Sequence, residues 1–202
     1  MEESESKPKA TRFDTILVLD FGGQYCHLIA RRIREQRVYS EIVPCDITAH
    51  EMSKMGDNLN IKGMILSGGP SSVYVEDAPK LDSEILNLGI AVLGLCYGHQ
   101  LIAHLFKGRV EKGVEREYGS TYVTVDKPVG ILEGLNREEK VWMSHYDTVY
   151  SLPEDFEVLA HTENCQVAAF RHKKKPVYGL QWHPEVVHTE HGTTMLRNFI
   201  FK

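Results

Sequence analysis

Short apolar segments alternate with amphipathic segments through the first half of the chain. Runs typical of strands occupy residues 15–19, 41–44, 62–66 and 91–95, and helical spacing of apolar residues occupies 27–33 and 79–88. Strands that are apolar on both faces and are separated by helices form parallel sheets with helices on both sides. The first half therefore predicts an open, mostly parallel sheet.

The second half has a different pattern. Strand-type runs follow one another with short connections at 120–125, 140–143, 156–160, 166–170 and 177–181, and a last helix is expected at about 193–201. Sequential strands with short connections indicate antiparallel pairing. We expect one α/β domain over residues 14–202, with a small antiparallel extension and a disordered, polar lead-in at residues 1–13.

Composition narrows the class of protein. The 202 residues are 42% hydrophobic and 25% charged with a formal net charge of -5, which gives no electrostatic reason to expect nucleic acid as a partner. The chain contains no apolar run of bilayer-spanning length and no secretory signal, so we expect no membrane association and a cytoplasmic location. Four well-separated cysteines suggest free thiols, one of which could be catalytic.

One of these cysteines lies at a predicted strand-to-helix junction. The run 91–95 ends at Cys96, Gly94 and Gly98 lie two residues away on either side, and residues 101–106 follow as the apolar face of a helix. Small neighbours permit a sharp turn that lifts the side chain from the sheet edge. The helix N-terminus directs N–H groups toward the sulfur and favours the thiolate. Cys96 is therefore a candidate nucleophile.

Two other strand ends complement this cysteine. His183 follows the predicted strand 177–181 and Glu185 lies two residues further, so they can serve as base and orienting acid. Residues 67–70 (Ser-Gly-Gly-Pro) follow the strand 62–66, and a glycine there can direct an N–H at an oxyanion. Carboxyl ends of parallel strands meet at one sheet edge, where sites form.

These motifs, in this order, resemble the class I glutamine amidotransferases over residues 15–201. Four further segments are similar to the glutaminase part of GMP synthetases: 20–25, 67–79, 116–119 and 183–192. The resemblance implies a flavodoxin-like, three-layer fold with helices on both faces of the sheet. It implies hydrolysis of L-glutamine through a cysteinyl thioester, with ammonia passed to an ATP-pyrophosphatase unit, on a separate chain or a fused domain, that aminates XMP to GMP.

The resemblance also implies roles for individual residues. Cys96 matches the nucleophile, His183 the base and Glu185 the orienting acid. The amides of Gly69 and Tyr97 match the oxyanion hole. The side chain of Gln100 and the segment formed by Ser144, His145, Tyr146 and Asp147 match the part that holds the amino-acid end of the substrate. Two positions depart from the family, because Tyr146 stands where glycine is common and Gly23 where serine or alanine is common.

Other interpretations of these residues remain open. Several histidines could suggest a metal site, but their spacing is unconvincing and we expect no metal. The chain lacks a nucleotide-binding phosphate loop, so we expect no cofactor in it and place ATP and magnesium in the partner. The same chemistry could serve a synthase that makes anthranilate, carbamoyl phosphate or imidazole glycerol phosphate. A cysteine hydrolase or peptidase of similar fold, or a non-catalytic binding protein, are further alternatives.

Overall fold

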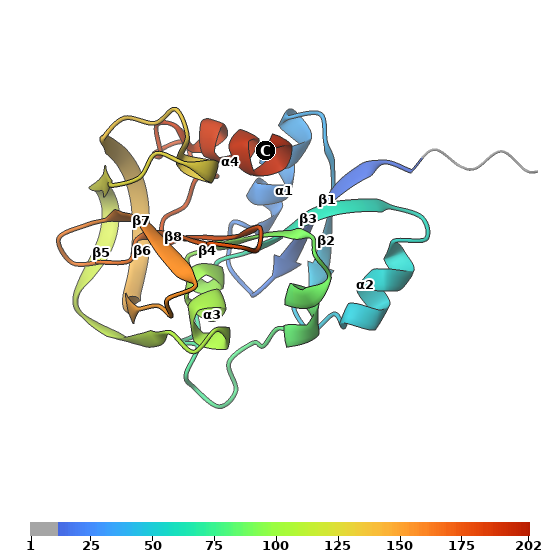
Figure 1. Ribbon diagram of the computed structural model, residues 1–202, viewed down its shortest axis with the longest axis horizontal. Helices are drawn as coiled ribbons and strands as arrows, with labels where there is room; N and C mark the ends of the chain where they lie inside the picture. The colour runs from blue at the N-terminus through green and yellow to red at the C-terminus, as the bar shows by residue number, and fades with distance from the viewer. Residues whose placement is uncertain (1–11) are drawn as a thin grey trace, which may run out of the picture.

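The computed structural model describes residues 12–202, and its strands form a single nine-stranded sheet in the order β2-β1-β3-β4-β9-β8-β7-β5-β6. Figure 1 shows the sheet running through the middle of the molecule. The strand bounds are β1 Asp14–Asp20, β2 Tyr39–Pro44, β3 Asn60–Leu66, β4 Ala91–Leu95, β5 Arg109–Val125, β6 Glu138–Ser151, β7 Phe156–His161, β8 Ala169–His172 and β9 Val177–Leu180.

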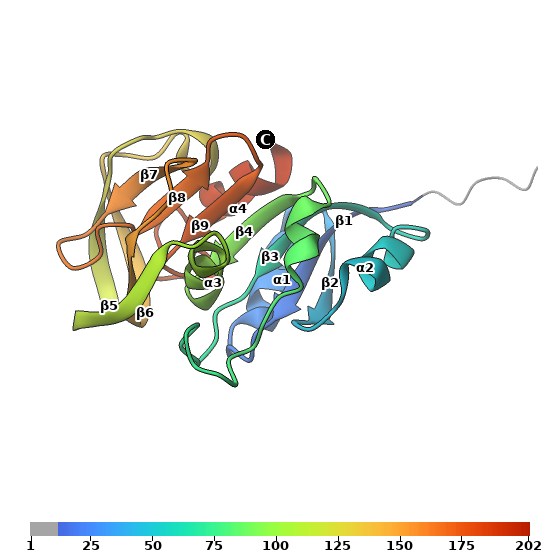
Figure 2. The same ribbon diagram turned by 60° about the horizontal axis from the view of Figure 1, so that its bottom comes forward.

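The sheet has a parallel part and an antiparallel part. Strands β2, β1, β3, β4 and β9 pair in parallel, and β9, β8, β7, β5 and β6 continue with antiparallel pairing. In Figure 2 the two parts lie side by side, with β5 and β6 at the end opposite β1 and β2. The expected α/β fold, with a mostly parallel sheet and an antiparallel extension, is confirmed.

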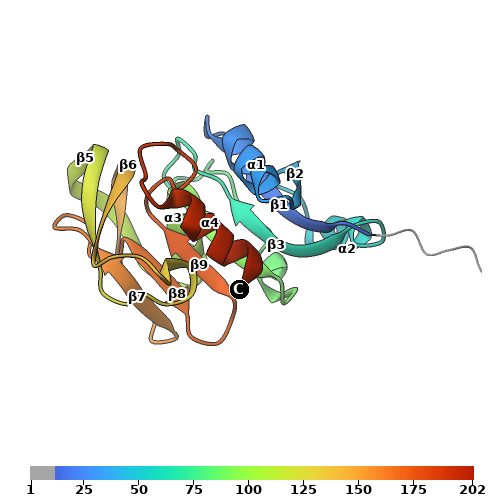
Figure 3. The same cartoon turned by 90° about the horizontal axis from the view of Figure 1, so that it is seen from above.

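Helices cover both faces of the sheet, as expected. Helices α1 (Cys26–Glu35) and α4 (Gly192–Phe201) pack on one face, and α2 (Ala49–Met55), α3 (Tyr97–Leu105) and the 3-10 helix η1 (Ser83–Asn87) pack on the other. A second 3-10 helix, η2 (Gly130–Leu132), joins the α1 side. Figure 3 shows α1 and α4 above the sheet.

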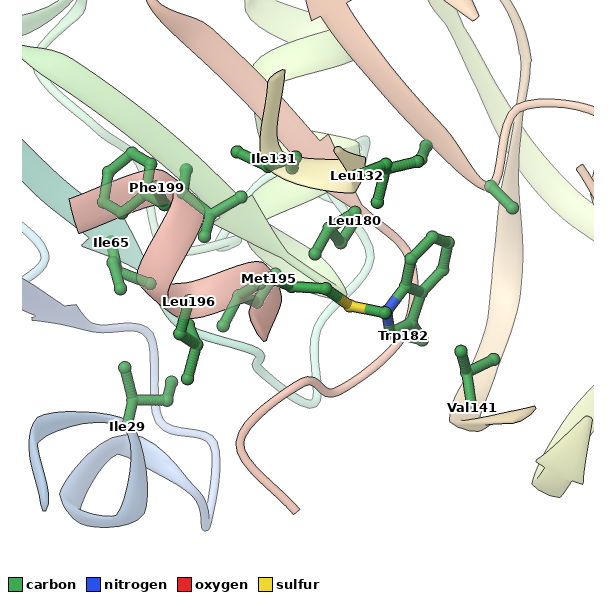
Figure 4. Close-up of a cluster of buried hydrophobic side chains, with 14 of the residues drawn as sticks. Ile29, Ile65, Ile131, Leu132, Val141, Leu180, Trp182, Met195, Leu196 and Phe199 are labelled. Carbon is green, nitrogen blue, oxygen red and sulfur yellow. The ribbon is translucent and has the colours of Figure 1, made fainter. Parts of the chain in front are cut away.

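The alternation of side chains along β1 explains the two cores. Ile16 and Val18 face the core that contains α1 and α4, whereas Leu17 and Leu19 face the core that contains α2 and α3. In Figure 4, Met195 of α4 reaches Trp182, whose indole N–H lies 3.2 Å from the Met195 sulfur. This contact anchors the segment that follows β9 and carries the histidine predicted to be catalytic.

Three local predictions were wrong or incomplete. Residues 79–88 form only the short helix η1, because the Asp82 carboxylate caps it by accepting from the Glu84 amide and Gly89, at φ +74°, follows. The strand expected at 166–170 begins at Ala169, after a turn closed by hydrogen bonds between Thr162 and Cys165. Helix α2 was not predicted, although Thr48 and Glu51 form a capping box at its start.

Within residues 12–202 no helix has the length and apolar character required to cross a bilayer. The lead-in expected at residues 1–13 lies, up to residue 11, outside the described residues. Phe13 already pairs with the sheet, because its carbonyl accepts a hydrogen bond from the Asn60 amide at 3.0 Å.

Candidate active site

Cys96 occupies a strained turn between β4 and α3. Its backbone has φ 52° and ψ -103°, a conformation that residues with a side chain rarely adopt. The turn is tight enough that a Cβ on Gly98 would lie 2.4 Å from the Leu66 carbonyl oxygen, and one on Gly94 would lie 2.4 Å from Gly98. Glycine at both positions is therefore a packing requirement of the turn that presents the Cys96 thiol.

Adjacent parallel strands bring His183 to the same edge. Strands β4 and β9 pair with Leu95 opposite Leu180, and the Cys96 amide donates to the Leu180 carbonyl at 2.9 Å. His183, three residues beyond Leu180, is held by its own amide, which donates to the Trp142 carbonyl at 3.0 Å. Cys96 and His183 consequently line one pocket.

Glu185 lies behind the imidazole of His183. The His183 Nδ1 and a carboxylate oxygen of Glu185 are 2.7 Å apart, and both side chains are buried. Burial by itself lowers the pKa of His183, but the Glu185 carboxylate and the adjacent Cys96 sulfur outweigh it and raise that pKa well above 6.5. The arrangement favours an imidazolium next to the sulfur. It leaves Nε2 of His183 free to exchange a proton in the pocket.

The loop after β3 forms a third side of the pocket. The Ser67 hydroxyl accepts from the Phe21 amide and donates to the Gly68 carbonyl, both at 3.0 Å. Because C=O and N–H point in opposite directions across a trans peptide, the hold on the Gly68 carbonyl also sets the direction of the Gly69 N–H. A Cβ on Gly69 would lie 2.6 Å from the Phe21 carbonyl oxygen, so the close approach requires glycine.

The pocket has a volume of about 570 Å³, which suits a small ligand. Of the ten residues predicted for the site, eight line it: Gly69, Cys96, Gln100, Ser144, His145, Tyr146, Asp147 and His183. Glu185 lies behind His183. The Tyr97 side chain points away and donates to the Pro79 carbonyl at 2.6 Å, but the prediction concerned only its backbone amide, at the start of α3.

The residues expected to hold the substrate belong to α3 and β6. Gln100 lies one helical turn after Cys96, and its side-chain N–H groups donate to the Asp147 carbonyl at 2.8 Å and to the Gln181 side chain at 3.1 Å. The Cys96 thiol lies 3.5 Å from the Ser144 carbonyl oxygen. These contacts join the nucleophile to the segment 144–147.

Sequence reasoning missed several residues that hold this site together. Tyr74, in the loop after β3, donates its hydroxyl to the Asp147 carboxylate at 2.9 Å. The Arg32 guanidinium, on α1, donates to the Glu185 carbonyl at 2.9 Å. The Thr189 hydroxyl donates to the His183 carbonyl at 2.6 Å. Tyr74 and Thr189 lie inside segments that carry the family resemblance, and no other sequence signal pointed to them.

Tyr146, the departure from the family pattern, has two cationic neighbours. The side-chain nitrogen of Lys112 lies 4.9 Å from the centre of its ring, and the guanidinium carbon of Arg116 lies 4.6 Å from it. Both cations come from the irregular stretch of β5 between Lys112 and Glu117, where the pairing register with β6 shifts. Cation–π attraction therefore fixes the tyrosine against β5.

A second group of chemically active side chains comes from β5, β6 and the connection between β7 and β8. Among the described residues, Glu117, His145 and Cys165 place one potential metal ligand atom each within 4.8 Å of the others. Glu117 already forms hydrogen bonds with His145 at 3.0 Å and with Thr162 at 2.9 Å. Burial and the Glu117 charge raise the pKa of the Cys165 thiol, which disfavours its thiolate as a ligand. Glu117 and His145 are therefore already engaged with protein partners.

Comparison with known proteins agrees with this geometry. The family model for class-I glutamine amidotransferases matches residues 17–202. The chain is 52% identical over 189 residues to the glutamine-hydrolyzing GMP synthase of Caldanaerobacter subterraneus, covering 94% of this chain and 36% of that protein. It is 48% identical over 186 residues to the enzyme of the same name from Thermosynechococcus vestitus, covering 92% of this chain and 34% of that protein. The chain thus spans about a third of the length of these relatives.

Solved structures give the same result. A Thermoplasma acidophilum protein described as a candidate GMP synthase component matches with a TM-score of 0.80 and 37% sequence identity, covering 94% of each chain. A glutamine amidotransferase from Thermotoga maritima shares the fold with a TM-score of 0.70 at 16% identity, covering 95% of this chain and 100% of that one. With the family model over nearly the whole described chain, these matches establish that the protein belongs to the class-I glutamine amidotransferases.

Proposed function

We propose that this chain is the glutaminase component of a GMP synthase. It hydrolyses L-glutamine to glutamate and supplies ammonia to an ATP-pyrophosphatase unit that aminates XMP to GMP. The observation that carries the proposal is the presence of Cys96 and His183 on one cavity, with Glu185 bonded behind the imidazole, in a chain 52% identical to a GMP synthase over 94% of its length.

The reaction follows from the positions of these groups. The Cys96 thiolate attacks the carboxamide carbon of glutamine, and the carbonyl oxygen becomes an oxyanion within reach of the N–H groups of Gly69 and Tyr97. Collapse of this intermediate breaks the C–N bond. The imidazolium of His183 gives its proton to the departing nitrogen, which leaves as ammonia, and a glutamyl thioester remains on Cys96.

Hydrolysis of the thioester restores the starting state. The now neutral imidazole of His183 takes a proton from a water molecule, and the water oxygen attacks the thioester carbon. Collapse of the second tetrahedral intermediate releases glutamate and regenerates the Cys96 thiolate next to a protonated His183. Glu185 keeps the imidazole oriented and stabilises its positive charge in both steps.

The partner supplies the rest of the synthesis. The relatives are about three times as long as this chain, which supports a further unit, fused or separate, that binds ATP, magnesium and XMP. A thiolate nucleophile needs reducing surroundings, which agrees with a cytoplasmic location.

The test combines this chain with a GMP-type ATP-pyrophosphatase unit. Glutamate release is measured for the chain alone and after addition of the partner, ATP, magnesium and XMP, and GMP formation is measured in parallel. We expect glutamate and GMP in equal amounts. An ammonium salt in place of glutamine shows that the partner is active, and the synthetase unit of an anthranilate synthase serves as the mismatched partner. Glutamate release that couples only to the mismatched partner would contradict the proposal.

A further inference from the structure

A series of buried polar side chains, joined by hydrogen bonds, connects the β7–β8 loop through β5 to β6, the strand that lines one side of the pocket. It begins at Thr162, between β7 and β8, whose hydroxyl donates to one carboxylate oxygen of Glu117 on β5 at 2.9 Å. The other carboxylate oxygen lies 3.0 Å from Nε2 of His145 on β6. The side chains of Glu117 and His145 are only 6% and 3% exposed, so solvent does not screen the pair.

Both ring nitrogens of His145 have hydrogen-bond partners. Nδ1 of His145 lies 3.0 Å from the Asp147 carbonyl oxygen, which can only accept, so Nδ1 carries a proton. Nε2 faces the Glu117 carboxylate, whose other oxygen already accepts from Thr162. The Glu117 carboxyl group therefore bonds to Thr162 through one oxygen and to His145 through the other. Both ring nitrogens of His145 are used inside the protein rather than in the cavity.

This series of hydrogen bonds ends at Gln100, whose side chain is expected to hold the substrate. The Asp147 carbonyl accepts from both His145 Nδ1 and the Gln100 side-chain nitrogen, at 3.0 and 2.8 Å. The second N–H of Gln100 donates to Gln181. Both hydrogens of the Gln100 amide are therefore committed, and its oxygen remains as an acceptor on the pocket side, where the α-ammonium group of an amino acid would need one.

We propose that Glu117 is a positioning residue for the glutamine pocket: it holds the His145 ring, which fixes the Asp147 carbonyl and thereby orients the Gln100 amide toward the substrate. This inference rests on the proposed glutaminase function and names a residue that touches neither the reacting atoms nor the cavity. Its effect is on substrate binding, because the reacting groups Cys96 and His183 are held by other contacts.

A purely structural pair would behave differently from a positioning pair. If Glu117 only stabilised the fold, its loss would lower the fraction of folded protein and leave the KM for glutamine of the remaining fraction unchanged. If it positions Gln100, the KM rises in protein that is fully folded. Counting active sites by alkylation of Cys96 separates the two cases.

The first experiment compares Glu117→Ala with Asp126→Ala. Asp126 forms a 2.8 Å pair with His161 on the same sheet, but the pair is more than one-third exposed and lies outside the pocket. For Glu117→Ala we expect the KM for glutamine to rise about tenfold, the effect of losing one buried hydrogen bond, with kcat per active site within about threefold. Asp126→Ala should match the wild type. A folded Glu117→Ala protein with an unchanged KM overturns the proposal.

Glu117→Gln provides the rescue. The glutamine amide can accept from Thr162 and donate to a neutral His145, so the geometry is kept while the charge is lost. We expect a KM within about threefold of the wild type. Nitrogen NMR of the His145 ring should report a protonated Nδ1, hydrogen-bonded to the Asp147 carbonyl, in both the wild type and Glu117→Gln. An unprotonated Nδ1 in the wild type also overturns the proposal.

Thr162→Val covers the case in which Glu117→Ala does not fold. Loss of the hydroxyl frees one oxygen of Glu117, and we expect about a threefold rise in KM that Thr162→Ser reverses. An unchanged KM in folded Thr162→Val counts against the proposal. Wild-type protein that fails to hydrolyse glutamine with its partner would instead refute the proposed function. The NMR experiment would still test the hydrogen bonds of the His145 ring, because it does not depend on activity.

Discussion

The two walls of the pocket are built in different ways. The wall that carries Cys96 and His183 follows the parallel strands β4 and β9, and backbone hydrogen bonds set both positions: the Cys96 amide donates to Leu180 of β9, and the His183 amide donates to Trp142 of β6. The wall that carries Ser144 to Asp147 belongs to the antiparallel part, where side chains from α3, β5 and the loop after β3 hold β6 in addition to its pairing with β5. Reacting groups are placed by backbone hydrogen bonds, and binding groups depend on side-chain hydrogen bonds as well.

This difference predicts two kinds of mutational response. On the wall with Cys96 and His183, the reacting wall, no other side chain can replace the nucleophile, so its removal should abolish kcat with little effect on the fold. On the wall with residues 144–147, the binding wall, several hydrogen bonds together hold the substrate-binding groups. Removal of any one of these bonds should therefore raise the KM by a modest factor. A substitution on the reacting wall that raised only the KM, or one on the binding wall that abolished kcat, would contradict this comparison.

The largest effect is expected at the nucleophile. Cys96→Ala should lower kcat by about 10³-fold or more, because no other group can form the thioester. Circular dichroism and thermal unfolding should match the wild type, since the elbow is fixed by backbone contacts. Cys45→Ala is the matched control, because Cys45 lies away from the pocket lining, and it should keep its activity. Glutamate release by Cys96→Ala at more than a few per cent of the wild-type rate would contradict the mechanism.

The next effect concerns the carboxylate behind His183. Glu185→Gln should reduce kcat about 10²-fold or more, because the imidazolium loses its buried counter-charge. It should also change the pH dependence of stability. Folded His183 has a raised pKa, so the folded state binds more protons than the unfolded state above about pH 6.5, and that contribution declines as pH rises.

Urea unfolding of the wild type and Glu185→Gln at several pH values tests this sign. The stability difference in favour of the wild type should be largest at about pH 6.5 and just below it, and should narrow as the pH rises toward the folded pKa of His183. A difference that widened with rising pH would mean that Glu185 does not stabilise the protonated imidazole.

A smaller effect is expected where the two walls are joined. Tyr74→Phe removes the hydroxyl that donates to the Asp147 carboxylate and should raise the KM for glutamine about threefold, with kcat unchanged. Tyr122→Phe is the control, because Tyr122 is an exposed tyrosine on β5 that does not line the pocket. Steady-state kinetics at saturating partner distinguish the two. A fall in kcat without a change in KM would assign Tyr74 to the reacting wall instead.

The smallest effect is expected at the departure from the family pattern. Tyr146→Gly should leave the KM within about threefold of the wild type, because the ring is engaged by Lys112 and Arg116 and the substrate contact is expected from backbone. Thermal stability should fall slightly, and Tyr146→Phe, which keeps the ring, should restore it. A KM rise of about tenfold or more in Tyr146→Gly would show that the tyrosine itself contributes to glutamine binding.

The sequence predicted the reacting wall better than the binding wall. The glycines around Cys96 and the position of His183 after a strand are local patterns, and the topology of parallel sheets converts them into a shared edge. Glu117 lies in the segment 116–119 that carries the family resemblance, but nothing there assigned it a role, and Thr162 belonged to no pattern. Their contacts join His145 to Glu117 and Glu117 to Thr162, pairs that are 28 and 45 residues apart. The first contact depends on the register of β5 and β6, which hydrophobic spacing does not specify around an irregular stretch, and the second depends on where the turn after β7 packs.

The amino-acid sequence by itself determined the α/β class, the parallel character of the first strands and the candidates for nucleophile, base and acid, because apolar period and glycine placement are short-range properties. Only the tertiary structure decided that both hydrogens of Gln100 are used internally, that Tyr146 lies against two cations, and that a buried carboxylate reaches the pocket through His145. Such contacts arise when distant side chains are desolvated together, and their geometry follows from packing that a linear pattern does not contain.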